Sequence, residues 1–172
     1  PCMDNDSVRR GKPSTHIKYG EASAVLAGSS LLTLAFEIIT DKKYSLNSKL
    51  KNKIVSSLAG CAGHTGIAGG QELDLKYENK NKKLTQIIDM QKKKTGKLFN
   101  FCLYAVGVVA NKSSKEKIFL SNLGEEIGLL FQLADDFLDI MGSKKLAGKL
   151  VKKDIKKGKS TLLNLLGDKK AY

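Results

Sequence analysis

The chain has 172 residues, of which 41% are hydrophobic and 6% aromatic, and its formal net charge is +13. This is enough apolar material for one domain with a sizeable core. Nucleic-acid binding is disfavoured, because every basic residue except Arg9 and Arg10 is a lysine and few aromatic side chains could stack on bases. No uninterrupted run of 18 apolar residues occurs, which predicts no membrane span. Three widely separated cysteines indicate a reducing compartment, so we expect a cytoplasmic protein.

Helices are predicted along most of the chain. Apolar residues at three-and-four spacing predict long helices at Glu21–Ile39, from Ser48 to about Gly69, at Leu84–Ala110 and at Ser114–Ile140. Polar connectors are predicted at 1–16, 41–47, 76–83 and 142–159, and a further helix begins at Thr161. Glycines crowd the later part of the second helix, where we expect close packing or an early end. No segment alternates with a period of two, so the predicted fold class is all-α, in a single domain.

Three carboxylates lie near the end of the fourth, markedly apolar helix. Asp135 and Asp139 are four residues apart and share a helix face, and Asp136 borders the same edge. Acids this close repel one another and are costly to desolvate, and a divalent cation would neutralise them. Mg²⁺ takes carboxylate oxygens and shares its coordination with substrate phosphates. The alternative from the pattern alone is that these acids line the exposed edge of an amphipathic helix.

A second charged segment lies near the start of the chain, where Asp4 and Asp6 are followed by Arg9 and Arg10. A site for Mg²⁺ and diphosphate needs acids for the metal and guanidinium groups for the phosphate oxygens. The alternative is a polar surface loop whose charges pair with one another.

Each of three further segments, considered alone, has a pattern that a common loop or turn explains. Gly158–Thr161 is similar to the end of a phosphate-binding P-loop, but the upstream glycine of that motif is missing, so nucleotide binding is not predicted. A lysine-rich loop that closes over an anion remains reasonable there. Lys94–Thr95, within the third predicted helix, is typical of a solvent-facing charged turn. Gly69–Gln71, followed by Asp74, is typical of a turn after a helix.

Taken in chain order, these segments resemble the trans-isoprenyl diphosphate synthases, a family of prenyltransferases. The matching motifs are Met3–Pro13, Tyr19–Gly28, Gly70–Leu75, Lys94–Gly96 and Phe131–Asp139, followed by Lys149, Asp154 and Lys159 in a basic loop. The Asp pair that opens the family's first motif would precede Pro1. The resemblance therefore implies the all-α helical bundle of the isoprenoid synthases, incomplete at both ends, and we expect this chain alone to turn over poorly or not at all.

The resemblance also implies an activity and a set of site residues. The reaction would be condensation of an allylic diphosphate with isopentenyl diphosphate to a farnesyl or geranylgeranyl product, in a Mg²⁺-dependent homodimer. Mg²⁺ would bind Asp4, Asp135 and Asp139, with Asp136 and Asp154 in support. The allylic diphosphate would contact Arg9, Lys94 and Lys159, assisted by Lys149, and isopentenyl diphosphate would contact Arg10. Catalysis would involve Lys94, Thr95, Gln132 and Lys159, with Gln71 and Asp74 orienting the site, Asp74 beside Lys94, and Thr95 and Gln132 offering oxygen dipoles to a carbocation.

Two other functions stay open at this point. One is a non-catalytic partner subunit of a heteromeric synthase. Asp135, Asp136 and Asp139 argue against it, because an inactive subunit would not need three carboxylates that are costly to desolvate. The other is a basic protein that binds RNA or a membrane surface through its charge of +13.

Overall fold

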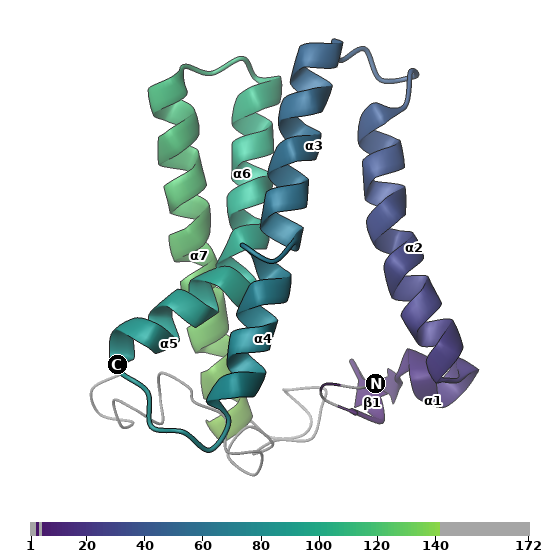
Figure 1. Cartoon of the computed structure of the whole chain (residues 1–172), viewed down its shortest axis with the longest axis vertical. Helices are drawn as coiled ribbons and strands as arrows, with labels where there is room; N and C mark the ends of the chain where they lie inside the picture. The colour runs from purple at the N-terminus through teal and green to yellow at the C-terminus, as the bar shows by residue number, and fades with distance from the viewer. Residues whose placement is uncertain (1–2, 4, 142–172) are drawn as a thin grey trace.

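The computed structural model describes residue 3 and residues 5–141, with side chains up to Leu138. Its elements are β1 (Val8–Arg9), β2 (Lys12–Pro13), α1 (Thr15–Tyr19), α2 (Glu21–Thr40), α3 (Ser48–Ala62), α4 (Ile67–Tyr77), α5 (Leu84–Gln91), η1 (Lys92–Gly96), α6 (Lys97–Val109) and α7 (Ser114–Met141). Figure 1 shows α3, α6 and α7 side by side, with α4 and α5 below them. The all-α prediction is confirmed.

The segment predicted as a loop at 1–16 contains a small antiparallel hairpin. Val8 pairs with Pro13 and Arg9 with Lys12. Arg10 and Gly11, between the strands, have φ of 52° and 74°. A tight two-residue hairpin turn needs two residues in the left-handed conformation. The hairpin therefore depends on this turn and not on an alternation of apolar and polar residues, which the segment lacks.

The single helix predicted from Ser48 to about Gly69 is wrong, because the chain breaks into α3 and α4. A Cβ atom at Gly66 would lie 2.0 Å from the carbonyl oxygen of Cys61, and one at Gly69 would lie 1.9 Å from that of His64. The tight connection therefore requires glycine at both positions. Helix α4 then continues to Tyr77, so Gly70–Asp74 is helical and the turn predicted there is also wrong.

The helix predicted at Leu84–Ala110 is continuous but not uniform. Between α5 and α6, the segment η1 forms one turn of π-helix over Lys92–Gly96. Such a turn widens the helix locally and is frequent at functional sites. The helix predicted at Ser114–Ile140 is confirmed as α7. The connector predicted at 142–159 and the helix predicted from Thr161 lie outside the described residues.

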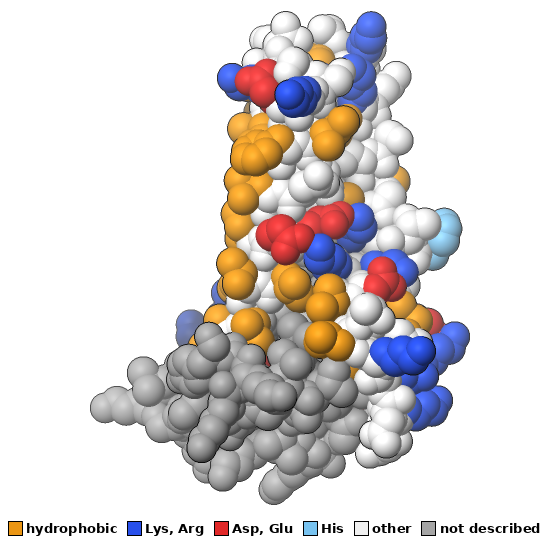
Figure 2. All heavy atoms as spheres, turned by 90° about the vertical axis from the view of Figure 1, so that its left-hand side faces the viewer, with side chains coloured by type: hydrophobic (Ala, Val, Ile, Leu, Met, Phe, Trp, Pro, Cys, Tyr) orange, Lys and Arg blue, Asp and Glu red, His pale blue; other side chains and the backbone are white. Residues whose placement is uncertain are grey.

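Burial differs sharply between helices. The apolar stripe predicted on α3 is confirmed, since Ile54, Leu58 and Cys61 are buried, and Ile87 and Met90 of α5 form a second core cluster. The stripe on α2 buries none of its residues, and its principal contacts among the described elements are with α1 and α3. Apolar side chains also lie along the face of the molecule seen in Figure 2.

Helix α2 also corrects the exclusion of a membrane span. It has 20 residues, and its most apolar window has a mean hydropathy of 1.7, so its length and composition would allow it to cross a membrane. A single helix of this kind is weak evidence, because core helices of soluble proteins and signal sequences meet the same criteria.

Candidate functional site

The first part of the site joins α4 to η1 through an ion pair. The Lys94 ammonium lies 2.7 Å from a carboxylate oxygen of Asp74, which is only 4% exposed. The two helices approach closely because Gly70 has no side chain: a Cβ atom there would lie 2.2 Å from the backbone nitrogen of Lys94. The structure therefore places Asp74 beside Lys94, as the family resemblance implies.

The π-helical turn sends its three lysines to three different helices. Lys94 pairs with Asp74 of α4, Lys93 with Asp89 of α5 and Lys92 with Glu126 of α7, all within 2.8 Å. The hydrogen bond to Glu126 raises the pKa of Lys92 above its ordinary value, although burial opposes the rise. The Lys94 and Lys92 pairs join η1 to α4 and α7, whereas the Lys93 pair spans one turn of the same continuous helix.

The second part of the site is a chain of hydrogen bonds from η1 to α7. The Thr95 hydroxyl donates to Oε1 of Gln132 over 2.8 Å. Nε2 of Gln132 donates to Oδ1 of Asp136 over 2.9 Å, and Nε2 of Gln91 donates to Oδ2 of Asp136 over 3.3 Å. Helix α7 lies close to η1 because Gly128 has no side chain: a Cβ atom there would lie only 2.5 Å from the Cα atom of Gly96.

The aspartates of α7 occupy different environments. Asp136 is 3% exposed and accepts hydrogen bonds on both carboxylate oxygens, whereas the preceding Asp135 is half-buried. Asp139 lies one turn further along α7, and its side chain is outside the described residues. Within the described part of the chain, no group of three metal-ligating side chains is assembled.

The remaining predicted residues are distributed as follows. Arg9 and Arg10 are exposed on the hairpin, which lies at the same end of the molecule as the C-terminal end of α7 (Figure 1). Gln71 is half-buried on α4. Residues Asp4, Lys149, Asp154 and Lys159 lie outside the described residues, so their assignments stay predictions.

Sequence reasoning missed Gln91, which is 3% exposed. Its signal is positional: it follows the buried Ile87 and Met90 by four residues and one residue, so it occupies the core stripe of α5. A glutamine at such a position must satisfy its amide in the interior, which makes it a candidate for a specific polar contact.

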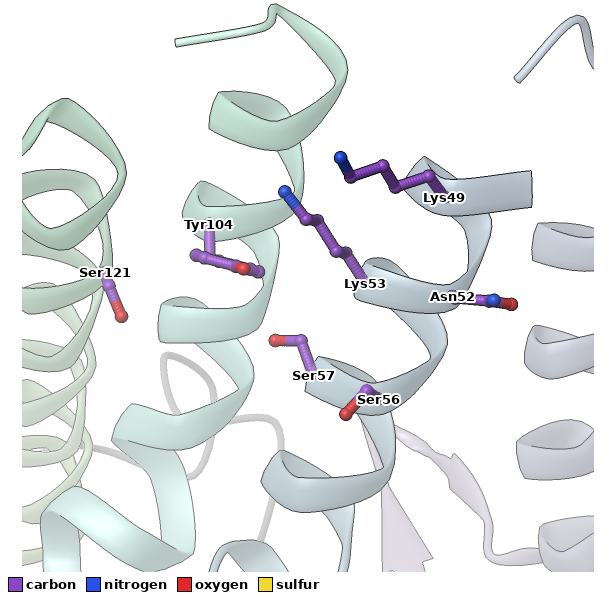
Figure 3. Close-up of a pocket in the computed structure, with 7 residues that line it drawn as sticks. All are labelled: Lys49, Asn52, Lys53, Ser56, Ser57, Tyr104 and Ser121. Atoms are coloured by element: carbon purple, nitrogen blue, oxygen red, sulfur yellow. The ribbon is translucent and has the colours of Figure 1, made fainter. Parts of the chain in front are cut away.

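A separate groove lies toward the opposite end of the bundle, between α3, α6 and α7. Its volume is about 770 Å³, and Figure 3 shows Lys49, Lys53, Ser57, Tyr104 and Ser121 among its lining residues. None of the residues predicted for the site lines this groove. One turn along α3 from Ser57, burial raises the pKa of the Cys61 thiol, so this buried cysteine stays protonated and is a poor nucleophile.

The fold and these contacts agree with comparisons to known proteins. The profile of the polyprenyl synthetase family matches residues 2–171. Farnesyl diphosphate synthase of Bacillus subtilis is 39% identical over 167 residues, which is 96% of this chain and 56% of that protein. Geranylgeranyl diphosphate synthase of Cyanophora paradoxa is 36% identical over 168 residues, 97% of this chain and 56% of that protein. The chain therefore belongs to the polyprenyl synthetase family, and it spans about half the length of the curated relatives it matches.

The structural likeness is equally extensive. A crystal structure of geranyltransferase from Helicobacter pylori, complexed with magnesium and isoprenyl diphosphate, has a TM-score of 0.90 and 34% sequence identity. The match covers 99% of this chain and 55% of that one. A farnesyl/geranylfarnesyl diphosphate synthase from Zymomonas mobilis, solved without ligands, has a TM-score of 0.85 and 38% identity, with 99% of this chain and 57% of that chain covered.

Proposed function

We propose that this protein is a short-chain prenyltransferase, which condenses an allylic diphosphate with isopentenyl diphosphate. The observation that carries the proposal is the assembly of Asp74, Lys94, Thr95 and Gln132 into one contact region next to Asp135, in a chain with a TM-score of 0.90 to an isoprenyl diphosphate complex. Relatives carry farnesyl and geranylgeranyl names alike, so the proposal specifies the short-chain class. A homodimeric state and a cytoplasmic location are part of the same proposal.

Magnesium fits the donor chemistry of α7. Asp135 is half-buried rather than enclosed, and Asp139 follows it at the spacing that places two carboxylates on one helix face. Hard carboxylate oxygens of this kind suit Mg²⁺, which also binds substrate phosphates. When bound, Mg²⁺ would neutralise negative charge that develops on the leaving diphosphate. Asp4 would complete the ligand set from the first motif, and Asp154 would support it from the segment predicted as a basic loop.

The chain's own residues have distinct roles in this proposal. Lys94 and Arg9, with Lys149 and Lys159 from the loop, bind the allylic diphosphate, and Arg10 binds isopentenyl diphosphate. Thr95 and Gln132 present oxygen dipoles to positive charge on the allylic carbon without attacking it as strong nucleophiles. Asp74 holds Lys94 in place, so that its ammonium group is directed before substrate arrives. Gln71 helps to orient the site from α4.

Thermal unfolding with inorganic diphosphate and Mg²⁺ tests this function. A ligand that binds only the folded chain at a hundredfold excess over its Kd adds about 2.7 kcal/mol to stability. For a chain of this size that corresponds to a rise in Tm of about 5–10 °C. We expect the rise to need both ligands, and Asp135→Ala to abolish it.

Asp89→Ala is the matched control, because it also removes an aspartate but at an exposed position on α5. It should keep the full rise in Tm. If the wild-type chain shows no rise, or if Asp135→Ala keeps it, the assignment of Asp135 to a Mg²⁺–diphosphate site is wrong. Turnover of both substrates by the full-length gene product then tests the reaction itself.

A further inference from the structure

Asp136 is the buried end of a hydrogen-bond chain rather than an open carboxylate. Both of its oxygens accept from side-chain amides, one on Gln132 in its own helix and one on Gln91 in α5. The residue is 3% exposed, whereas its neighbour Asp135 is half-buried. Two adjacent aspartates therefore have different surroundings, and only Asp135 is open enough to serve as a direct ligand for a hydrated cation.

Because Asp136 accepts a hydrogen bond on each of its two oxygens, it fixes the direction of the hydrogen bonds that follow from it. The end of the Gln132 amide that faces Asp136 is the NH₂ group, which donates to Oδ1 over 2.9 Å. The carbonyl oxygen of Gln132 then faces Thr95, and the Thr95 hydroxyl must use its proton to donate to that oxygen. The lone pairs of the Thr95 oxygen are left to face whatever lies beside it, which suits a cation and disfavours an anion.

Gln91 secures the far side of the same carboxylate. Its NH₂ group faces Asp136, and its Oε1 atom is buried without a hydrogen-bond partner among the described residues. Turning the amide over would give no relief, because it would place a carbonyl oxygen against a carboxylate. In this orientation the Oε1 atom of Gln91 has no hydrogen-bond partner among the described residues, whereas Asp136 gains a donor.

We propose that Asp136 is a positioning residue, not a metal ligand: with Gln91 behind it, it sets the direction of the Gln132–Thr95 hydrogen bonds so that Thr95 offers an electron-rich oxygen to the site. The role of the Thr95 oxygen in the reaction rests on the proposed prenyltransferase function. The direction of the hydrogen bonds does not depend on that function, and it can be measured without any enzymatic activity.

The side-chain amide signals of Gln132 in NMR spectra of the full chain are the first test. In the wild type we expect one set of signals, with one amide proton shifted and protected by its bond to a carboxylate. Asp136→Asn should return this proton toward the ordinary amide position or give two sets as the amide turns over. Asp89→Asn, the same change at an exposed carboxylate of α5, should leave the signals unchanged.

A second variant covers the case in which Asp136→Asn does not fold. Thr95→Val keeps the shape of Thr95 and removes only its hydroxyl. If Asp136 sets the direction, the Gln132 amide stays in one orientation in Thr95→Val. If its signals double, Thr95 rather than Asp136 controls the amide, and the proposal is overturned. An unshifted, unprotected Gln132 amide in the wild type would overturn it as well.

The second test compares the adjacent aspartates with one probe, inorganic diphosphate with Mg²⁺. Asp135→Asn should lose the rise in Tm, and Asp136→Asn should keep it while its Gln132 signals change. Loss of the rise in Asp136→Asn alone would make Asp136 the metal ligand and overturn the proposal. If no chain, wild type included, responds to the probe, the proposed function fails, and the Gln132 signals still decide the role of Asp136.

In a preparation that turns over, the kinetic expectation is equally specific. Misdirecting Thr95 should lower kcat for Asp136→Asn about 10-fold to 100-fold, while the KM for each substrate stays within about twofold. A variant that raises KM and leaves kcat unchanged would assign Asp136 to substrate binding instead and would contradict a positioning role.

Discussion

Helix α2 and the crossing of α4, η1 and α7 show two ways in which this chain is ordered. All 20 residues of α2 lie outside the core, and Leu26 and Leu31 are each 67% exposed. At the crossing, by contrast, Gly70 and Gly128 bring backbones so close that a single methyl group would not fit at either position. The first region is a helix because of its own residues, and the second has its shape because helices distant in sequence touch.

The difference has a consequence for the site. Local hydrogen bonds and helix propensity can build α2, but they cannot bring Asp74 to Lys94 or Gln91 to Asp136, which are 20 and 45 residues apart. Those contacts depend on glycines that let the helices approach. Changes at the crossing should therefore affect stability and the site together, whereas changes on α2 should leave the site unaffected and alter stability by about 1 kcal/mol or less.

The largest effect is expected from Gly70→Val. The new Cβ atom would lie 2.2 Å from the backbone nitrogen of Lys94, and backbone cannot move aside as a side chain can. We expect a loss of about 3 kcal/mol or more in the free energy of unfolding, the upper range for overpacking. Urea unfolding measures it.

Gly28→Ala is the matched control in α2, because nothing lies within 4 Å of a Cβ atom there. Alanine favours a helix interior over glycine by about 1 kcal/mol, so this variant should be slightly more stable than the wild type. Equal destabilisation by both changes would contradict the contrast between the two regions.

The second prediction compares two Asp–Lys pairs of nearly equal length. Asp74→Ala leaves Lys94 without its carboxylate in a largely buried contact and should cost about 3 kcal/mol. Asp89→Ala breaks the pair with Lys93 at the surface and should cost less than about 1 kcal/mol. The distances, 2.7 and 2.8 Å, do not distinguish the pairs, so the difference in unfolding midpoint should come from burial and from the fact that the Lys94 pair joins two helices, whereas the Lys93 pair lies within one. Similar costs would show that burial does not govern these pairs.

These comparisons also explain which features could be predicted from the sequence. Helices α2 and α7 were located within about one residue, because their apolar spacing is a local property. The break between α3 and α4 was missed. The composition of residues 60–70 shows that glycines are frequent there, but it does not show which backbone atoms lie close to them. The π-helical turn at Lys92–Gly96 has no periodic signature and was missed for the same reason.

The site divides in the same way. The residue types of the motifs identified Lys94, Thr95, Gln132 and the aspartates of α7 as candidates, and family resemblance placed Asp74 beside Lys94. Sequence alone did not separate the surroundings of Asp135 and Asp136, because adjacent positions on one helix differ only in what packs against them. Gln91 was missed because its partner lies on another helix.

The third prediction concerns a local interaction at the start of α7. The side chain and backbone of Ser113, followed by Lys112, lower the pKa of Glu116 from 4.5 to about 2. Because the folded-state pKa is the lower one, the stabilisation is complete above about pH 4.5 and is lost as the pH falls toward 2. Glu116→Gln should therefore unfold at a lower urea concentration than the wild type at pH 6, and the difference should shrink by pH 3. If the stability difference between Glu116→Gln and the wild type does not depend on pH, it arises from packing and not from the charge of Glu116.

The smallest effect is expected on α2, where Leu31→Gln replaces an apolar side chain that is 67% exposed. Exposed positions without specific contacts usually change stability by less than about 0.5 kcal/mol, and glutamine is nearly as good a helix former as leucine. The buried counterpart is Ile87→Ala, which removes a core side chain and should cost about 2–5 kcal/mol. Urea unfolding of both variants at several protein concentrations measures the contrast. If Leu31→Gln costs more than about 1.5 kcal/mol, this face of α2 is covered in solution, and a dependence of that cost on protein concentration would identify a second copy of the chain as the cover.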